Sequence, residues 1–233
     1  MSHLWQRENP AFYEREKVAV ETYYPQLRFV EAGDVVCVRG TFPVLFEGQV
    51  LDRYSVELEL AHDHPNGLPI VREVGGRISR HADRHINAND GTACALLPDE
   101  RWRVWPKGAP LLDFLKGPLH GFFLAQSLVE AGQPWPRAQW AHGAKGVFQF
   151  YREILKTADL RVMITFLEYI TAKKPKGYWA CACRSGKPLR QCHFVLVSSL
   201  REKMSRKDAL RSLKTAGVSA VEMTEAKPAP ASK

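Results

Sequence analysis

The chain has 233 residues, which suits one core of ordinary domain size plus an appendage, and its hydrophobic content of 45% predicts a globular protein rather than a disordered one. No run of about 18 apolar residues is present and the opening stretch MSHLWQRENP is polar, so we expect no membrane span, no membrane partner and no secretory signal. The expected location is therefore cytoplasmic. The net charge of +8, with Lys and Arg dense from 173 to 214, is compatible with an acidic or nucleic-acid partner and equally with plain solvated helices.

The amino-terminal half predicts a helix followed by antiparallel strands. Residues 9–23 form the helix, with Asn9 as its cap and Pro10 in its first turn. RFVEAGDVVCVRG indicates a hairpin with its turn at 32–34, and TFPVLFEG a further strand. DRYSVELELA alternates, which places Tyr54, Val56, Leu58 and Leu60 on one buried face. HPNGLP is a turn, and IVREV a short last strand.

The rest of the chain predicts an irregular segment and then helices. Residues 75–109 lack periodicity, and so long a loop inside a domain is usually functional. Helical patterns follow from 110 to about 131, from 141 to 156 and from 159 to 172. KKPKG then resembles a linker, a last helix covers about 194–216, and the end of the chain is rich in Pro and Ala. Helix, strands, loop and helices in this order predict an α+β fold.

Cys94 follows the polar, turn-prone stretch HINANDGTA and is a candidate nucleophile, because a working thiol needs access and a polar setting. Asn87 is the first candidate donor to an oxyanion and Asn89 the second, while His85 is either a base or an anchor of the loop. The alternative is a small buried cysteine that closes the loop. Asp83, Asp90 and Asp99 are either helpers in orienting or deprotonating an attacking lysine amine or charges on a solvated loop.

The other cysteines divide into a cluster and a single residue. Cys181, Cys183, Cys192 and His193 supply four soft ligands within thirteen residues, as closed tetrahedral zinc sites require. An odd total of five cysteines without a signal peptide argues against a disulfide framework. Cys37 lies in the apolar run DVVCVRG and is expected to be buried. The histidines at 62, 64, 81, 120 and 142 show no metal spacing and are expected to be structural or exposed.

The region from Tyr54 to Gln126 resembles ubiquitin-conjugating enzymes, and in particular their bacterial relatives. The resemblance lies in the order of parts: strand RYSVELELA, turn HPNGLP, His85-Ile86-Asn87 before Gly91 and Cys94, then Trp105-Pro106 and a helix near 110. With the leading helix and strands it covers roughly residues 9–156. It implies a ubiquitin-conjugating-type fold that carries a ubiquitin-like protein as a thioester on Cys94 and passes it to a lysine of a target protein. The implied partners are an activating enzyme, the ubiquitin-like protein and the target, in an operon that often serves antiphage defence.

CACRSGKPLRQCH, from Cys181 to His193, is similar to the SEC-C motif, a short zinc-binding module that binds proteins and sometimes nucleic acid. The resemblance implies zinc as a structural ion. Together the two resemblances predict a conjugating-type domain over 1–172, a zinc module over 173–217 and a flexible tail over 218–233.

Two other functions compete with the transferase. Ile86 in place of the family's proline, a shorter His-to-Cys spacing and Ala95 in place of leucine motivate a catalytically inactive scaffold with a zinc-dependent binding module. The third function is nucleic-acid binding by the basic carboxyl-terminal part, with Tyr178 and Trp179 stacking on bases. The phosphate contacts would come from Lys173, Lys174, Lys176, Arg184, Lys187 and Arg190.

Overall fold

The computed structural model describes residues 4–136, 140–141 and 143–225, with side chains described up to residue 217. The chain divides into two compact units, residues 1–139 (unit 1) and 140–233 (unit 2), which are described separately below. The sequence placed the boundary after residue 172, whereas the two helices between 143 and 171 belong with the Cys/His module. No described helix is both long and apolar enough to span a bilayer.

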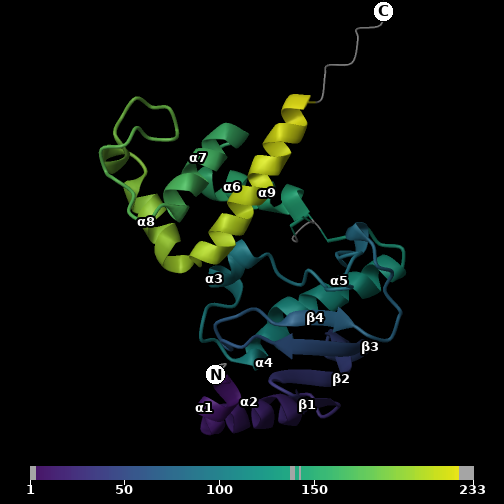
Figure 1. Cartoon of the computed structure of the whole chain (residues 1–233). Coiled ribbons are helices and arrows are strands. Elements are labelled where there is room, and N and C mark those ends of the chain that lie inside the picture. The colour runs from purple at the N-terminus through teal and green to yellow at the C-terminus, as the bar shows by residue number, and fades with distance from the viewer. Residues whose placement is uncertain (1–3, 137–139, 142, 226–233) are drawn as a thin grey trace, which may run out of the picture. The chain divides into compact units, whose positions relative to one another are not determined.

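Unit 1 begins with two helices, α1 (Trp5–Glu8) and α2 (Pro10–Tyr23) (Figure 1). The predicted cap of α2 is confirmed, because the Asn9 side chain accepts the Phe12 N–H (3.1 Å). The sequence did not predict α1, which is a single turn. Its Trp5 is buried and lies edge-on to Phe12, with ring centroids 5.8 Å apart. The short helix thus seals one end of the unit 1 core.

Four antiparallel strands follow in the order β1 (Leu27–Ala32), β2 (Val35–Phe46), β3 (Gln49–Leu60) and β4 (Ile70–Glu73). The predicted hairpin turn is confirmed, with Gly33 at φ +64°. TFPVLFEG is not a further strand, because residues 41–46 continue β2 and pair with β3, and residues 47 and 48 form the turn between the two strands. Gly40 carries β2 through this region at φ +143°, where a Cβ would lie 1.9 Å from the Gln26 carbonyl oxygen. The pairing of β2 with β3 therefore continues past Gly40.

The alternating face of β3 lies in the core, as predicted, and Tyr54, Val56, Leu58 and Leu60 are all buried. Helices α4 (Leu111–Phe114) and α5 (His120–Glu130) supply the other side of this core (Figure 1). Between them Leu115–Leu119 forms a π-helical turn around Pro118, which has no N–H to donate to an α-helical turn. Cys37 is buried as expected, but it lies among the charged side chains on the other face of the sheet.

The segment after β4 is irregular, as predicted. It holds two 3₁₀ turns, Ala82–Arg84 and Pro98–Glu100, and the single-turn helix α3 (Arg101–Val104). The α+β prediction for the chain is confirmed by this sheet and its helices.

Unit 2 contains α6 (Gly143–Leu155), α7 (Leu160–Thr171), a 3₁₀ turn at Leu189–Gln191, α8 (Phe194–Lys203) and α9 (Arg206–Glu225). The single last helix of the prediction is two helices, because Ser205 starts a new one by accepting the Asp208 N–H (3.0 Å). The chain is helical rather than irregular from 218 to 225, and the rest of the predicted tail lies outside the described residues.

Candidate functional site

The stretch around Cys94 is a tight hairpin. Ile86 and Ala93 form an antiparallel bridge, and the Asn87 N–H donates to the Thr92 carbonyl oxygen (2.8 Å). The Cys94 N–H then donates to the carbonyl oxygen of His85 (2.8 Å). The Asn- and Asp-rich run between the two arms is the turn, closed by Gly91 at φ +69°. The residues before Cys94 are polar because they form this turn.

This hairpin docks against the edge of the sheet. The Ala93 N–H donates to the Val71 carbonyl oxygen (2.8 Å), and Thr92 bridges Arg72 of β4. Ile86, which stands where the family pattern has proline, is buried in the core. Backbone pairing on one side and an apolar anchor on the other therefore fix the position of the Cys94 backbone.

Cys94 is exposed, so the alternative of a small buried cysteine is wrong. Protein atoms around the sulfur nevertheless disfavour the thiolate, and this desolvation raises the pKa of the thiol. The negative charge of Asp90 raises the pKa of Cys94 further. The thiol is accessible, and its raised pKa favours the protonated form.

The ring of His85 is buried and stacks on Trp135, with centroids 4.1 Å apart and ring planes 8° from parallel. Its backbone has φ +52° and its carbonyl oxygen holds the Cys94 amide, so the geometry favours the anchoring alternative. The Asn87 Oδ1 atom accepts the Asn89 N–H (3.2 Å), which orients the Asn87 side chain within the turn. Catalytic roles for His85 and Asn87 remain predictions.

Of the three candidate aspartates, Asp83 and Asp90 are exposed. Asp99 is fully buried, so its interpretation as a solvated loop charge is wrong. The Asp90 carboxylate accepts both the N–H (3.0 Å) and the hydroxyl (2.7 Å) of Thr92, which lowers its pKa and keeps its charge beside the hairpin. Asp90 is therefore a turn-forming residue in this structure.

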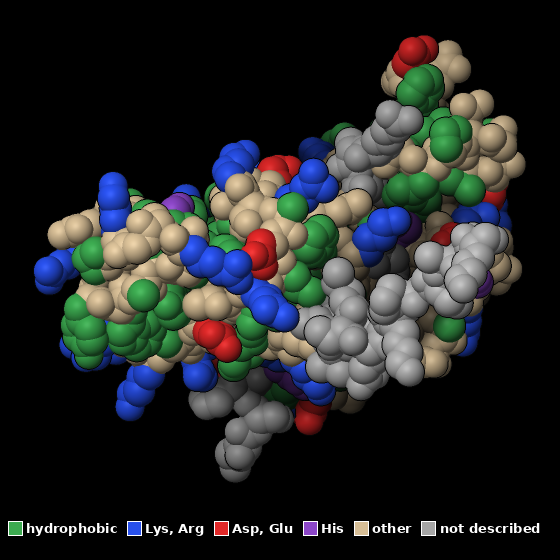
Figure 2. All heavy atoms as spheres, turned by 90° about the horizontal axis from the view of Figure 1, so that it is seen from above, with side chains coloured by type: hydrophobic (Ala, Val, Ile, Leu, Met, Phe, Trp, Pro, Cys, Tyr) green, Lys and Arg blue, Asp and Glu red, His purple; other side chains and the backbone are tan. Residues whose placement is uncertain are grey.

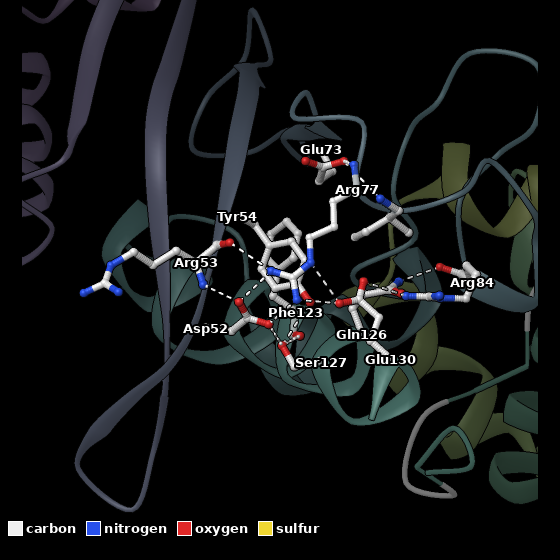
Figure 3. Close-up of polar contacts among 11 residues, drawn as sticks. Asp52, Arg53, Tyr54, Glu73, Arg77, Arg84, Phe123, Gln126, Ser127 and Glu130 are labelled. Carbon is white, nitrogen blue, oxygen red and sulfur yellow. Dashed lines mark hydrogen bonds and ion pairs between the residues drawn. The ribbon is translucent and has the colours of Figure 1, made fainter. Parts of the chain in front are cut away.

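A polar network that the sequence did not reveal holds the segment leading into the hairpin (Figure 3). Arg77 donates two hydrogen bonds to Asp52 of β3 (both 2.6 Å) and binds Glu130 of α5 through Nε (2.9 Å). Its guanidinium also lies over the Tyr54 ring, 4.5 Å from the centroid. These contacts hold the pKa of Asp52 below its ordinary value. The three charged residues are 25 and 53 positions apart, so no local pattern marks them.

The same network reaches the residue before His85. The buried Gln126 amide donates to the Arg84 carbonyl oxygen (2.6 Å) and accepts from the Arg84 Nε (2.8 Å). Glu130 accepts a further bond from the Arg84 guanidinium (3.1 Å). Figure 3 shows Arg84 and Gln126 facing each other across this contact. Helix α5 thus clamps the hairpin at its first arm.

Two histidines have the structural roles expected of them. His64 is buried with its Nε2 3.3 Å from Glu16, whose carboxylate also accepts the Leu111 N–H (2.8 Å). The His120 ring lies 2.9 Å from the carbonyl oxygen of Leu45. The first contact ties α2, the proline turn and α4 together.

In unit 2, Cys181, Cys183, Cys192 and His193 come together as predicted, with their ligand atoms all within 4.8 Å of one another. The sulfur of Cys183 lies 3.4 Å from that of Cys181 and 3.5 Å from that of Cys192. The His193 Nδ1 lies 3.2 Å from the Cys181 sulfur and 3.1 Å from the Cys192 sulfur. This cluster could hold a metal ion.

Backbone pairing builds the cluster. The Cys181 N–H donates to the Lys187 carbonyl oxygen (3.0 Å) and the Leu189 N–H to that of Trp179 (2.7 Å). Arg184 and Gly186, both at positive φ, turn the chain between these arms. Cys192 and His193 then follow the 3₁₀ turn, and α8 begins at the next residue.

The cluster is attached along α7. The His193 ring lies edge-on to Phe166 (5.2 Å), and the Tyr169 hydroxyl donates to the Ala180 carbonyl oxygen (2.8 Å). Arg184 pairs with Asp159, the cap of α7, at 2.9 Å. Contacts at both ends of this helix explain why it belongs to unit 2.

No family model, curated protein or solved structure matches this chain.

Proposed function

We propose that the chain is an acyl carrier of the ubiquitin-conjugating type, with Cys94 as the thioester-forming residue and a zinc-stabilised module at its carboxyl-terminal side. One observation carries the proposal. An exposed cysteine ends a rigid hairpin docked on the last strand of a four-stranded meander, ahead of the helix that covers the sheet. The order of parts that resembles conjugating enzymes in the sequence has this arrangement in space.

The proposed reaction has two acyl transfers. The Cys94 sulfur gives up its proton to solvent and attacks the thioester that joins an activating enzyme to the carboxyl terminus of a ubiquitin-like protein. A new C–S bond forms, and the activating enzyme's thiolate leaves and takes up a proton. A lysine amine of the target then attacks the same carbonyl carbon. Nitrogen replaces sulfur, Cys94 is released as a thiolate, and the amine loses a proton to solvent or to a carboxylate.

The surroundings of Cys94 suit a carrier better than a hydrolase. A raised thiol pKa keeps the resting sulfur protonated, so the residue reacts little with unactivated acyl groups. The hairpin holds the sulfur at the surface, where two large proteins can reach it. Asn87 is the proposed oxyanion donor. Its side-chain amide is oriented by the bond from the Asn89 N–H, and its backbone pairs with Thr92, two positions before Cys94.

Zinc is the proposed ion at the Cys/His cluster. Zinc binds thiolates at about 2.3 Å and imidazole nitrogen at about 2.0 Å, so tetrahedral sites place neighbouring sulfurs about 3.8 Å apart and sulfur and nitrogen about 3.6 Å apart. Four of the six distances between ligand atoms fall within about 0.5 Å of these values, and all six are within 4.8 Å. All four positions would be filled by protein, so the ion would be a structural cross-link.

The test of the carrier uses a chemically activated thioester of a ubiquitin-like protein, or an activating enzyme with ATP. We expect an adduct that a reducing agent releases, and Cys94→Ala should abolish it. Cys94→Ser should instead give an oxygen ester that survives reducing agent and breaks in alkali. Cys37→Ala, which removes a buried thiol of the same unit, is the matched control and should still form the adduct. An adduct that persists in Cys94→Ala would refute the assignment.

The inactive scaffold is the second candidate, and two observations favour it. The pKa of Cys94 is raised, and the geometry of His85 is that of an anchor rather than a base. A scaffold would form no adduct even with its cognate partners, whereas a carrier would form one that depends on Cys94.

A further inference from the structure

The net positive charge of the chain arises from unit 2. Residues 140–233 contain 18 Lys and Arg against 7 Asp and Glu, a net charge of +11. Residues 1–139 contain 15 against 18, a net charge of −3. Neither the acyl-carrier proposal nor the metal site accounts for this asymmetry, because three thiolates around one Zn²⁺ leave a net charge of only about −1 to compensate.

Part of this charge lies in two short segments, one of which carries an exposed aromatic side chain. Lys173, Lys174, Lys176, Lys187 and Arg190, together with Tyr178, are here named the basic face, and all six are exposed. Tyr178 is 70% exposed. Figure 2 shows Lys and Arg side chains gathered with few acidic ones on its left, where the Cys/His module lies.

Backbone contacts hold the two segments of the basic face side by side. The Arg190 N–H donates to the Gly177 carbonyl oxygen (2.8 Å), directly before Tyr178. The Arg190 side chain lies so close over Gly177 that a Cβ there would be 3.0 Å from the Arg190 Cβ. This pairing places Arg190 beside the backbone that leads into Tyr178, so the segments 173–178 and 187–190 lie next to each other.

The structure also shows which basic and aromatic candidates are already engaged. Arg184 pairs with Asp159, and Trp179 packs on Tyr169 with centroids 5.1 Å apart. Among the described residues, none of the five cations of the basic face has an ion-pair partner. Tyr178 is the aromatic side chain of this region that remains open to a planar ligand.

We propose that the basic face binds single-stranded nucleic acid, with Tyr178 stacking on a base and the five cations contacting phosphates. Stacking on an open ring needs an unpaired base, and a cluster of Lys and Arg beside it follows the backbone of the same strand. An acidic protein surface would pair with the cations, but acidic side chains do not stack on an exposed ring as unpaired bases do. This function is independent of the acyl transfer proposed for Cys94.

The test measures binding of the zinc-loaded full chain to labelled single-stranded oligonucleotides of about 12 nucleotides, as DNA and as RNA, between about 50 and about 200 mM salt. Five phosphate contacts predict a slope of about −3.5 for log affinity against log salt concentration. Replacing Lys173, Lys174 and Lys176 by Gln should reduce the slope by about two. Lys145, Arg152 and Arg161 are exposed cations of α6 and α7, and their replacement by Gln is the charge-matched control, which should leave the slope nearly unchanged.

Tyr178 gives the second arm of the test. Tyr178→Ala should weaken binding at least about fivefold through loss of stacking, while Tyr178→Phe should retain it. If the two charge-matched triple variants lose equal affinity for the oligonucleotides, the proposal that the basic face binds them is overturned. If polyglutamate binds as tightly as the oligonucleotides and Tyr178→Ala does not weaken that binding, the basic face would instead bind acidic proteins. No binding to either oligonucleotide at about 50 mM salt would also overturn the proposal.

Discussion

Removing one cluster ligand should release the metal and open a defined part of unit 2. Four of the six distances between ligand atoms lie within about 0.5 Å of tetrahedral zinc geometry, so the full chain should hold one zinc ion with three sulfur neighbours near 2.3 Å and one nitrogen near 2.0 Å. Cys183→Ser removes one thiolate. Since outer-sphere changes alone weaken metal binding 10- to 100-fold, loss of a ligand should weaken it by about 100-fold or more.

The expected consequence is local. In the ligand loop only Cys181, Ala182 and Leu189 are buried, so the loop has little core of its own. In contrast, α7 contributes a run of buried side chains, including Phe166 and Leu167, which do not depend on the ion. Zinc supplies about 10–16 kcal/mol to small zinc-finger peptides, far more than the loop's few apolar contacts.

The assays are metal content after gel filtration, X-ray absorption at the zinc edge, and hydrogen exchange. In Cys183→Ser we expect a zinc content well below one per chain and faster exchange over 179–193, with protection kept in α6 and α7. Cys94→Ser is the matched control, since it removes an exposed thiol of unit 1 and should leave the zinc content at one. Equal zinc content in the two variants, or an absorption spectrum without sulfur neighbours, would falsify the reasoning.

Three further predictions concern unit 1. Because burial and Asp90 raise its pKa, Cys94 should react with iodoacetamide ever faster as pH rises past the pKa of an ordinary thiol, and Asp90→Asn should speed the reaction a few-fold near pH 8. Gln126→Leu leaves the polar groups that it binds unsatisfied and should lower the free energy of unfolding by about 1–3 kcal/mol in urea titrations. Gly40→Ala places a Cβ against a carbonyl oxygen and should cost more stability than Gly48→Ala, which is strained at φ +80° but meets no neighbour.

Each of these has an outcome that contradicts it. If the Cys94 alkylation rate levels off at a pH below the pKa of a free thiol, the raised pKa of Cys94 is contradicted. Gln133→Leu changes an exposed glutamine and should hardly change the free energy of unfolding. An equal loss of stability in Gln133→Leu and Gln126→Leu would show that the bonds between Gln126 and Arg84 do not stabilise the fold. Equal stability of the two glycine variants would mean that β2 can shift away from Gln26.

The sequence was most informative where one face of an element meets water. The alternation in β3 predicted its buried side, and Asn9 with Pro10 predicted the start of α2, because both signals depend on neighbouring residues alone. The metal cluster was predictable for the same reason, since its four ligands fall within thirteen residues. Exposure of Cys94 agreed with the polar turn that precedes it.

Features that depend on distant residues were missed. The contacts that join Arg77 to Asp52 and Glu130 span 25 and 53 positions, and the burial of Asp99 is decided by surroundings that a linear pattern does not contain. The break between α8 and α9 had a local signal, because Ser205 and Asp208 have the spacing of a helix cap. The KKPKG segment was read as a boundary, although contacts across it make it an internal loop.

Arg201 adds a practical consequence. It donates to the carbonyl oxygens of Ile170 (2.6 Å) and Ala172, the last ones of α7, and Arg206 reaches that of Thr171 (3.0 Å). A fragment starting at Lys173 would leave these guanidinium groups with no helix end to bind. It would also lack α7, against which the cysteine loop packs. Anyone dissecting the protein should therefore cut near Trp140, where the excised half retains its own scaffold.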